Sequence, residues 1–142
     1  MKCLFGFLSI ILFGCSAGIN KSNVPFEVLN SGQNASIENI EFLLIENNED
    51  YISAIEKLNI DESNYDDLLQ VDFKYNNACI LFLGQRNTGG YSIEIDYIVK
   101  KQKTLYIKTR EITPNKNENV TMALTNPYCL ISIPKIKKII LK

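Results

Sequence analysis

The sequence contains no histidine and no tryptophan. Without histidine, the chain cannot by itself form a Ser-His-Asp or Cys-His catalytic site, a histidine-ligated zinc site or a histidine pH switch. Any catalysis would have to use carboxylates, lysine, tyrosine or cysteine, a narrower choice than most hydrolases use. We therefore expect a protein that is not an enzyme and that has neither a cofactor nor a metal, with one calcium alternative given below.

The sequence also lacks an excess of charge of either sign. Its 15 Lys and Arg nearly balance its 16 Asp and Glu, which gives a formal net charge of −1 at pH 7. Because phosphate binding needs a concentrated positive field, this balance gives no reason to expect a nucleic-acid partner. A length of 142 residues suits one domain, and a 46% share of hydrophobic residues is ordinary for a protein with a core.

No apolar run is long enough for an ordinary membrane-spanning helix, but the N-terminus has the features of a signal peptide. Met1-Lys2 is positively charged and Leu4–Phe13 is apolar. The following Gly14-Cys15 completes a Leu-x-Gly-Cys ending that resembles the bacterial lipobox. The resemblance implies that residues 1–14 are a lipoprotein signal peptide and that Cys15 carries a diacylglycerol thioether and an acylated amino group. An ordinary signal peptide with a coincidental cysteine is the alternative.

Residues 15–23 are expected to form a lipidated, flexible tether, because Ser16–Asn23 is small and polar without hydrophobic periodicity. Several acyl chains, at about 0.8 kcal/mol per buried methylene, would make the anchor effectively permanent. We therefore expect a bacterial cell-envelope protein held at a membrane through Cys15. The residue directly after Cys15 is Ser16 and not an acidic residue, which favours the outer membrane in a two-membrane cell. Residues 24–142 are then expected to form one domain.

The first half of this domain predicts two strands and an extended segment. Phe26–Leu29 alternates and is expected to stop at Asn30-Ser31-Gly32, while Glu41–Ile45 is a second apolar run. Val71–Phe73 is expected to start an extended segment that Asn76-Asn77 breaks.

A helix is expected from about Glu49 to Leu58, capped by Asn47 or Asn48. Apolar residues recur along it at three-residue steps, which is typical of a side that faces the core. A helix that binds a partner is the alternative. The residues of this stripe are Ile52, Ile55 and Leu58, with Tyr51 beside them.

Asp61–Gln70 is expected to be a solvated acidic loop. Clustered carboxylates suggest calcium as an alternative, but the spacing lacks the glycine and the terminal glutamate of an EF-hand loop. The carboxylates are Asp61, Glu62, Asp66 and Asp67.

The second half predicts a β-hairpin. Ala78–Leu83 is apolar on both faces, which is typical of a strand covered on both sides, and Tyr91–Val99 alternates as a half-buried strand. Because glycine tolerates positive φ, Thr88-Gly89-Gly90 is interpreted as the tight turn that joins them and sets their register. The side chains of Tyr91, Ile93, Ile95, Tyr97 and Val99 are expected on one face, and those of Ser92, Glu94, Asp96 and Ile98 on the other.

Three further strands are expected after this hairpin, at Thr104–Ile112, Cys129–Ile133 and Ile136–Leu141. Lys100–Lys103 is expected to be a solvated, edge-protecting turn, and a recognition patch is the alternative. The order of elements predicts an α+β fold, in which a mostly antiparallel sheet of about six or seven strands packs with one main helix.

Cys79 and Cys129 are the cysteines of the expected domain, and both lie in apolar strand runs. They are either two buried hydrophobic residues or a disulfide, which requires Cα atoms within about 7 Å. An apolar setting raises the pKa of a thiol and favours its inert form, so neither is expected to be catalytic.

The block Gly84–Ile95, with its Gly-x-Arg-x-Thr-Gly-Gly-Tyr signature, resembles the protease complex subunit PrcB family. The resemblance extends to Val71–Phe73, Pro114, Thr121–Tyr128 and Ile133–Lys135, and it is best over residues 71–142. It implies an envelope lipoprotein that is a non-catalytic accessory or stabilising subunit for a secreted, subtilisin-like protease. If the chain has an interaction face, its candidates are the exposed groups beside the expected hairpin: Arg86, Asn87, Thr88 and Tyr91, with Glu94 and Asp96.

The motif also has a purely structural interpretation. Gly84, Gly89 and Gly90 would form the turn, Tyr91 would pack on Pro127 and Tyr128, and Arg86 would pair with Glu94 across the hairpin.

Two other functions are open. A lipid-anchored envelope module could bind a peptide, a glycan or another ligand through a concave aromatic patch near Tyr91, Tyr97 and Tyr106. A hydrolase could use Glu94 and Asp96, which point the same way along a strand, although no setting that would raise the pKa of either is visible in the sequence.

Overall fold

The computed structural model describes residues 24–60, 63, 65–68 and 70–142. The expected signal peptide, Cys15 and the tether therefore lie outside the described residues, as do Asp61 and Glu62 of the calcium alternative. In the part of the chain that is described, no helix is long and apolar enough to cross a membrane.

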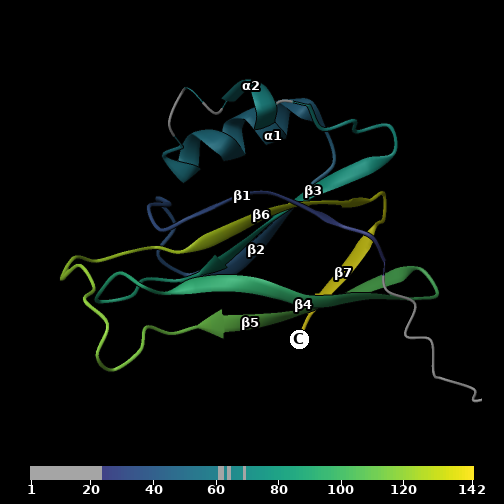
Figure 1. Ribbon diagram of the computed structural model, residues 1–142. Helices are drawn as coiled ribbons and strands as arrows, with labels where there is room; N and C mark the ends of the chain where they lie inside the picture. Colours follow the sequence, from purple (N-terminus) through teal and green to yellow (C-terminus); the bar gives the residue numbers. More distant parts are fainter. Residues whose placement is uncertain (1–23, 61–62, 64, 69) are drawn as a thin grey trace, which may run out of the picture.

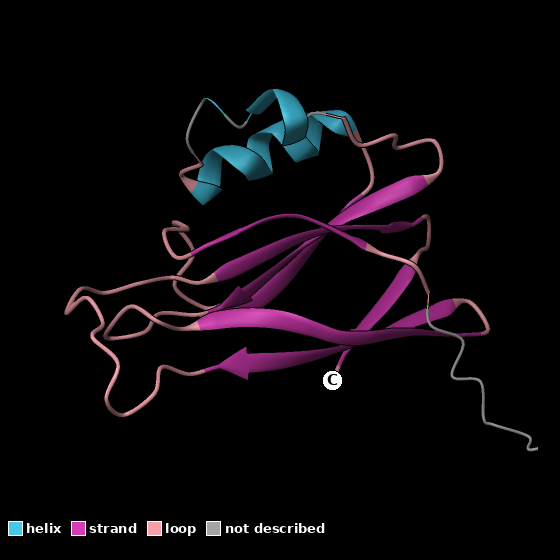
Figure 2. Cartoon of the chain, in the orientation of Figure 1, coloured by secondary structure: helices cyan, strands magenta, loops and turns pink. Residues whose placement is uncertain are grey.

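The described chain forms three layers, with helices above a four-stranded sheet and a three-stranded sheet below it (Figure 1; Figure 2). The α+β class and the seven, mostly antiparallel strands are confirmed, and the strands are divided between two sheets. The four-stranded sheet has the order β1 (Glu27–Gly32), β6 (Tyr128–Pro134), β3 (Asn76–Leu83), β2 (Ile40–Ile45). The three-stranded sheet has the order β4 (Ser92–Lys101), β5 (Thr104–Ile112), β7 (Lys138–Leu141), in which β7 runs parallel to β5. The helices are α1 (Asn48–Ile55), continued by the 3-10 turn η1 (Glu56–Leu58), and α2 (Tyr65–Leu68).

Strand β3 is buried on both faces, as predicted from its continuous apolar run. Because side chains alternate along a strand, one set enters a core under the helices and the other a core between the two sheets. We call these the helix-side core and the inter-sheet core. Ala78, Ile80 and Phe82 lie in the helix-side core, and Cys79, Leu81 and Leu83 lie in the inter-sheet core. Strand β6 divides in the same way, with Leu130 on the helix side and Ile131 between the sheets.

The predicted hairpin between β3 and β4 is wrong, because the two strands belong to different sheets. Strand β3 pairs with β2 and β6, while β4 pairs with β5. Residues 84–91 cross from one sheet to the other instead of turning back within one sheet. A local glycine signal marks a change of direction, but it does not reveal that two distant apolar strands provide better partners for β3.

The helix is confirmed, including its cap: the Asn47 side chain accepts a hydrogen bond of 2.9 Å from the Asp50 backbone amide. The predicted stripe is wrong at Ile52, which is 40% exposed. A helix has 3.6 residues per turn, so the buried side is better described by steps of three and four. The buried residues are Tyr51, Ala54, Ile55 and Leu58.

Four local predictions are wrong because contacts elsewhere in the fold override local signals. Asn30–Gly32 does not end β1 but continues it against β6, after a bulge. Asn77 does not break a strand, because it lies within β3 and its side-chain amide donates to the Ile136 carbonyl at 2.7 Å. Val71–Phe73 does not begin a strand but leads into a turn, and 65–68 is helical where a loop was expected.

The predicted alternation along β4 holds only in its first part. A bulge between Ile95 and Tyr97 shifts the register against β5, so that Ile93 and Ile98 both enter the inter-sheet core. Ile98 was expected on the polar face, because a bulge leaves no clear signal in an alternating sequence.

Cys79 and Cys129 are both buried and unpaired. In the register of β3 and β6, Cys79 lies opposite Ile131 and Cys129 lies opposite Leu81, so the cysteines are diagonal neighbours. Diagonal positions are typically about 7–8 Å apart, beyond the usual span of a disulfide. Burial raises the pKa of Cys79 to about 12 and that of Cys129 to about 11.

We expect both thiols to resist alkylation by iodoacetamide at pH 8 in the native protein. The thiolate is the reactive form, and the raised pKa values lower its population by on the order of a hundredfold or more relative to an unfolded thiol. Mass spectrometry of peptides carrying Cys79 and Cys129 gives the rate at each site. Full alkylation of both within minutes without denaturant would contradict this burial.

Candidate functional site

The loops that join the strands gather at one end of the molecule, on the left in Figure 1. They are residues 33–39, 84–91 and 113–127, and we call this region the loop end. It contains most of the glycine-rich block that the sequence singled out. Hydrogen bonds connect all three loops, so this end is braced by contacts between segments far apart in the sequence.

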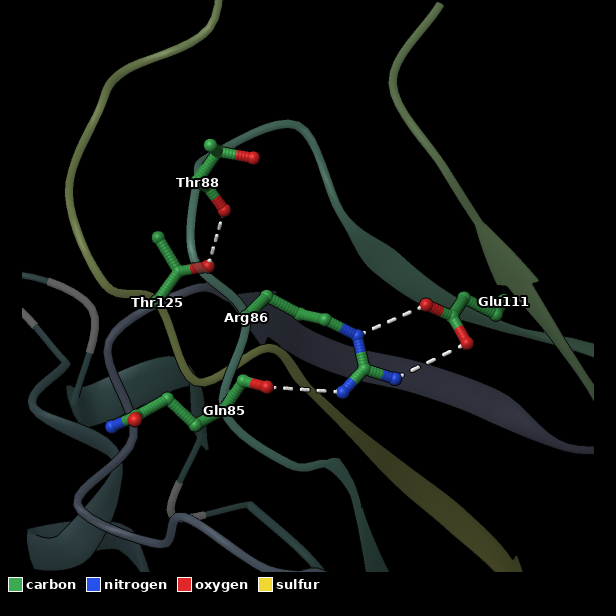
Figure 3. A network of polar contacts seen from close by, with 5 residues as sticks. All are labelled: Gln85, Arg86, Thr88, Glu111 and Thr125. Atoms are coloured by element: carbon green, nitrogen blue, oxygen red, sulfur yellow. Dashed lines mark hydrogen bonds and ion pairs between the residues drawn. The ribbon is translucent and has the colours of Figure 1, made fainter.

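Arg86 ties the two sheets together at the loop end. It follows β3 of one sheet, and its guanidinium binds the Glu111 carboxylate on β5 of the other sheet through two contacts of 3.0 and 3.2 Å (Figure 3). A third contact of 3.1 Å reaches the Gln85 carbonyl, and the guanidinium lies 5.7 Å from the centre of the Tyr91 ring. This planar, two-point arrangement suits arginine and not lysine.

The predicted pairing of Arg86 with Glu94 is therefore wrong. Glu94 lies opposite Arg110 in the β4–β5 register and binds it at 2.7 Å. The prediction failed because it assumed that β3 and β4 are neighbours.

Thr125 holds the loop of residues 84–91 against the loop of residues 113–127. The backbones of Thr125 and Arg86 exchange hydrogen bonds of 2.8 and 2.9 Å, and the Thr125 hydroxyl donates to the Thr88 carbonyl at 2.8 Å (Figure 3). The Gly89 amide donates to the Thr121 carbonyl at 2.9 Å. Thr88 was expected to contact a partner, and in the structure its backbone carbonyl binds Thr125 and so connects the two loops.

Gly89 and Gly90 permit this close approach. Gly90 has φ of +84°, and a Cβ there would lie 2.8 Å from both Pro114 Cβ and Val120 Cγ1. A Cβ on Gly89 would collide with the Thr121 hydroxyl. Gly84, at φ of +80°, turns the chain directly after β3. The glycines are structural, as one interpretation predicted, but they form a packed crossover and not a hairpin turn.

Pro127 and Tyr128 attach the third loop to the four-stranded sheet. The Pro127 carbonyl accepts from the Leu83 amide at 2.9 Å, and the Tyr128 hydroxyl donates to the Asn30 side chain at 2.7 Å. Tyr128 lies in the helix-side core, whereas Tyr91 packs against the inter-sheet core. The expected packing of Tyr91 on Tyr128 is therefore wrong, because β6 separates the two cores.

Two large apolar side chains are exposed on this braced framework. Met122 is 87% exposed and Leu124 is 63% exposed, and they alternate with the bracing residues Thr121 and Thr125. Asn87 is also exposed. Sequence reasoning missed Met122 and Leu124, because residues 121–124 form an exposed bend that no alternation or periodicity marks.

The carboxylates of the hydrolase alternative are held by a cation. Arg110 binds Glu94 at 2.7 Å and Asp96 at 3.3 Å, and both carboxylates are on the surface. Among the described residues, no three or more His, Cys, Asp and Glu are grouped so that they could hold a metal ion.

The aromatic patch of the ligand-binding alternative is partly covered by cations. The ammonium groups of Lys101 and Lys142 lie 5.6 and 5.0 Å from the centre of the Tyr106 ring. The guanidinium of Arg86 lies over Tyr91 in the same way, so both rings already contact cations.

Residues 78–134 match the family model of the PrcB C-terminal domain. The match supports membership of the PrcB family over this segment of the chain. The match runs from β3 to the end of β6, so it includes Arg86, the glycines and the two exposed apolar residues of the loop end. No curated protein and no solved structure matches the chain. The PrcB segment thus contributes strands to both sheets, and β1, β2, the helices and β7 lie outside it.

We expect Gly90→Ala to lower the free energy of unfolding by about 2 kcal/mol, since the added methyl group meets two side chains at a positive φ. Urea denaturation of the full chain measures the change. Asn87→Ala, in the same loop but exposed, is the matched control and should stay within about 0.5 kcal/mol of the parent. Equal effects of the two substitutions would contradict the packing at Gly90.

A double-mutant cycle on Arg86→Ala and Glu111→Ala should give a coupling energy of about 0.5–1 kcal/mol, because the pair is bidentate and the arginine is mostly covered. The Arg110–Glu94 pair, with side chains 59% and 52% exposed, should couple more weakly. A stronger coupling at Arg110–Glu94 would show that the sheets are not joined through Arg86.

Proposed function

We propose that the protein is a non-catalytic envelope lipoprotein that serves as an accessory subunit of an extracytoplasmic protease, and that the loop end contacts the partner. The observation that carries this proposal is the exposure of Met122 and Leu124, 87% and 63%, within the PrcB segment. The family match supports association with a protease complex. The lipobox resemblance at Cys15 supports the proposal that the protein is anchored in the cell envelope.

The loop end has the physical properties of a protein-binding surface. Ordering a loop on binding opposes association, and the bracing by Arg86, Thr125 and the glycines supplies that order in advance. Exposed Met and Leu side chains gain free energy when a partner removes them from water, at about 25 cal/mol per Å². Asn87 adds a polar group at the same end. The apolar pair would be the anchor of the contact, and the polar group would belong to its rim.

A non-catalytic role agrees with the chemistry of the described residues. Cys79 and Cys129 are buried with raised pKa values, and Glu94 and Asp96 are bound to Arg110. The alternative of an envelope module that binds a peptide or glycan has less support, because cations cover Tyr91 and Tyr106.

We expect a photo-crosslinker at position 122 of the full chain to capture a protease in the native envelope, and Met122→Ser with Leu124→Ser to abolish co-purification of that protease. The double variant should keep its unfolding free energy within about 0.5 kcal/mol, since both side chains are exposed. The readouts are identification of the captured protein and its proteolytic activity.

Tyr75→Ser is the matched control, because Tyr75 is 62% exposed and lies at the opposite end of β3. It should leave co-purification unchanged. Capture of no protease at position 122, or unchanged protease level and activity after deletion of the gene, would refute the proposal.

The lipid anchor has its own test. Cys15→Ala should abolish incorporation of radiolabelled palmitate and stop processing of the signal peptide, because the thioether cannot form. Palmitate incorporation that survives Cys15→Ala would place the lipid elsewhere or show that the lipobox resemblance is coincidental.

A further inference from the structure

The near-neutral net charge of the chain hides a separation of charge. Residues 98–103 and 133–138 contain six lysines and no carboxylate. Residues 38–57 contain six carboxylates and one cation, Lys57. All six lysines of the first two segments are exposed, and none forms an ion pair with a described carboxylate. We call this region the lysine end: Lys100, Lys101, Lys103, Lys135, Lys137 and Lys138.

The fold brings the two lysine segments together. Strand β7 runs parallel to β5 with Thr104 opposite Lys138, so the segment before β7 lies beside the β4–β5 turn. A hollow of about 240 Å³ opens between them, lined by Lys100, Gln102, Lys103, Lys135, Ile136 and Lys137. The Lys135 ammonium donates to the Phe73 carbonyl at 2.7 Å, which fixes the position of this charge. Four lysines thus line one hollow, and such a concentration of positive charge favours phosphate groups.

The lysine end lies where the described chain leads back toward Cys15. The Val24 amide donates to the Ile98 carbonyl at 2.9 Å, two residues before Lys100. Eight residues separate Cys15 from Val24, so an anchor at Cys15 would hold this end within about 30 Å of the membrane surface. The electrostatic attraction of lysines to anionic lipid acts within a Debye length of about 8–10 Å. A tether of this length lets the lysine end come within that range of the surface, where the attraction itself would have to hold it.

We propose that the lysine end binds the phosphate head groups of an anionic phospholipid membrane and thereby orients the domain. Strands β4 and β6 run between the loop end and the lysine end, so the loop end then points away from the membrane. If Lys100–Lys103 only protected the edge of a sheet, a single charged turn would be sufficient. Instead, lysines from two separate segments line one hollow. The proposal rests on the lipid anchor at Cys15 that the proposed function includes, but it holds whether or not a protease binds the loop end.

The test uses the lipidated full chain in two kinds of vesicle, one of phosphatidylcholine and one with about one third phosphatidylglycerol. A membrane-impermeant amine reagent labels exposed lysines, and mass spectrometry gives the rate at each site. Each lysine near an anionic surface favours the bound orientation by about fivefold. We expect labelling of Lys100, Lys103 and Lys137 to slow by on the order of tenfold in anionic vesicles only, and protection to vanish near 1 M salt, where the Debye length is about 3 Å.

Lys57 on η1 and Lys116 at the loop end are internal controls, because both are exposed and lie away from the hollow. Their rates should be equal in the two kinds of vesicle. Equal labelling of the lysine end in both vesicles, or protection of Lys116 instead, would overturn the proposal. Neither readout involves a protease, so failure here is distinct from failure of the proposed function.

Two further measurements distinguish lipid head groups from other molecules that carry phosphate. Millimolar inorganic phosphate with neutral vesicles should give no protection, and neither should a short single-stranded DNA. Protection by inorganic phosphate alone would indicate a small-anion site, and protection by DNA would indicate a general polyanion site, so either result would overturn the membrane assignment.

A charge-reversal variant, with Lys100→Glu, Lys103→Glu and Lys137→Glu, should lose the difference between anionic and neutral vesicles at the remaining lysines of this end. The matched variant with Lys57→Glu and Lys116→Glu should retain it. Circular dichroism establishes that both variants are folded, and retention of protection in the first variant would refute the proposal.

Discussion

Burial of β3 on both of its faces is the constraint on which the rest of the structure depends. Its alternate side chains enter two separate cores, so helices must cover one face and a second sheet the other. Tyr51 on α1 shows how the helices cover one face of β3. Its side chain is fully buried, and its hydroxyl donates to the Leu68 carbonyl at 2.8 Å. Both edges of β3 are paired, one with β2 and the other with β6, so β4 cannot be its neighbour and the chain crosses between sheets through residues 84–91.

That crossing explains why a glycine-rich block is part of the PrcB segment. The block has to leave one sheet, pass beneath the loop of residues 113–127 and enter the other sheet within eight residues. Gly90 lies against Pro114 and Val120, and Arg86 reaches Glu111 on the second sheet. The same contacts that join the sheets leave Met122 and Leu124 on the outside. Structure and proposed recognition are therefore built from one set of interactions.

The two proposed surfaces lie at opposite ends of the strands. Strand β4 begins beside the loop end and finishes in the lysine end, and β6 does the same. A ten-residue strand spans about 33 Å, so a domain held at a membrane by its lysines would present its loops well above the lipid head groups. An accessory subunit of this design would hold its partner at a set height and orientation.

Local patterns were sufficient for much of the fold. The continuous apolar run of β3, the capping asparagine of α1 and the bounds of β5 were all readable, because each depends on residues near one another in the chain. The failures share a different property. The pairing of β3, the partner of Arg86, the register of β4 after its bulge and the continuation of β1 each depend on a residue far away in sequence.

The sequence by itself determined the α+β class, the two-faced burial of one strand and the family resemblance, since these follow from composition, alternation and a contiguous motif. Only the tertiary structure decided which strands pair, because pairing is a choice among many apolar segments that a local pattern cannot rank. It also decided which lysines gather around one hollow and which side chains remain exposed. Surfaces are built from residues of different segments, and their proximity exists only in the folded chain.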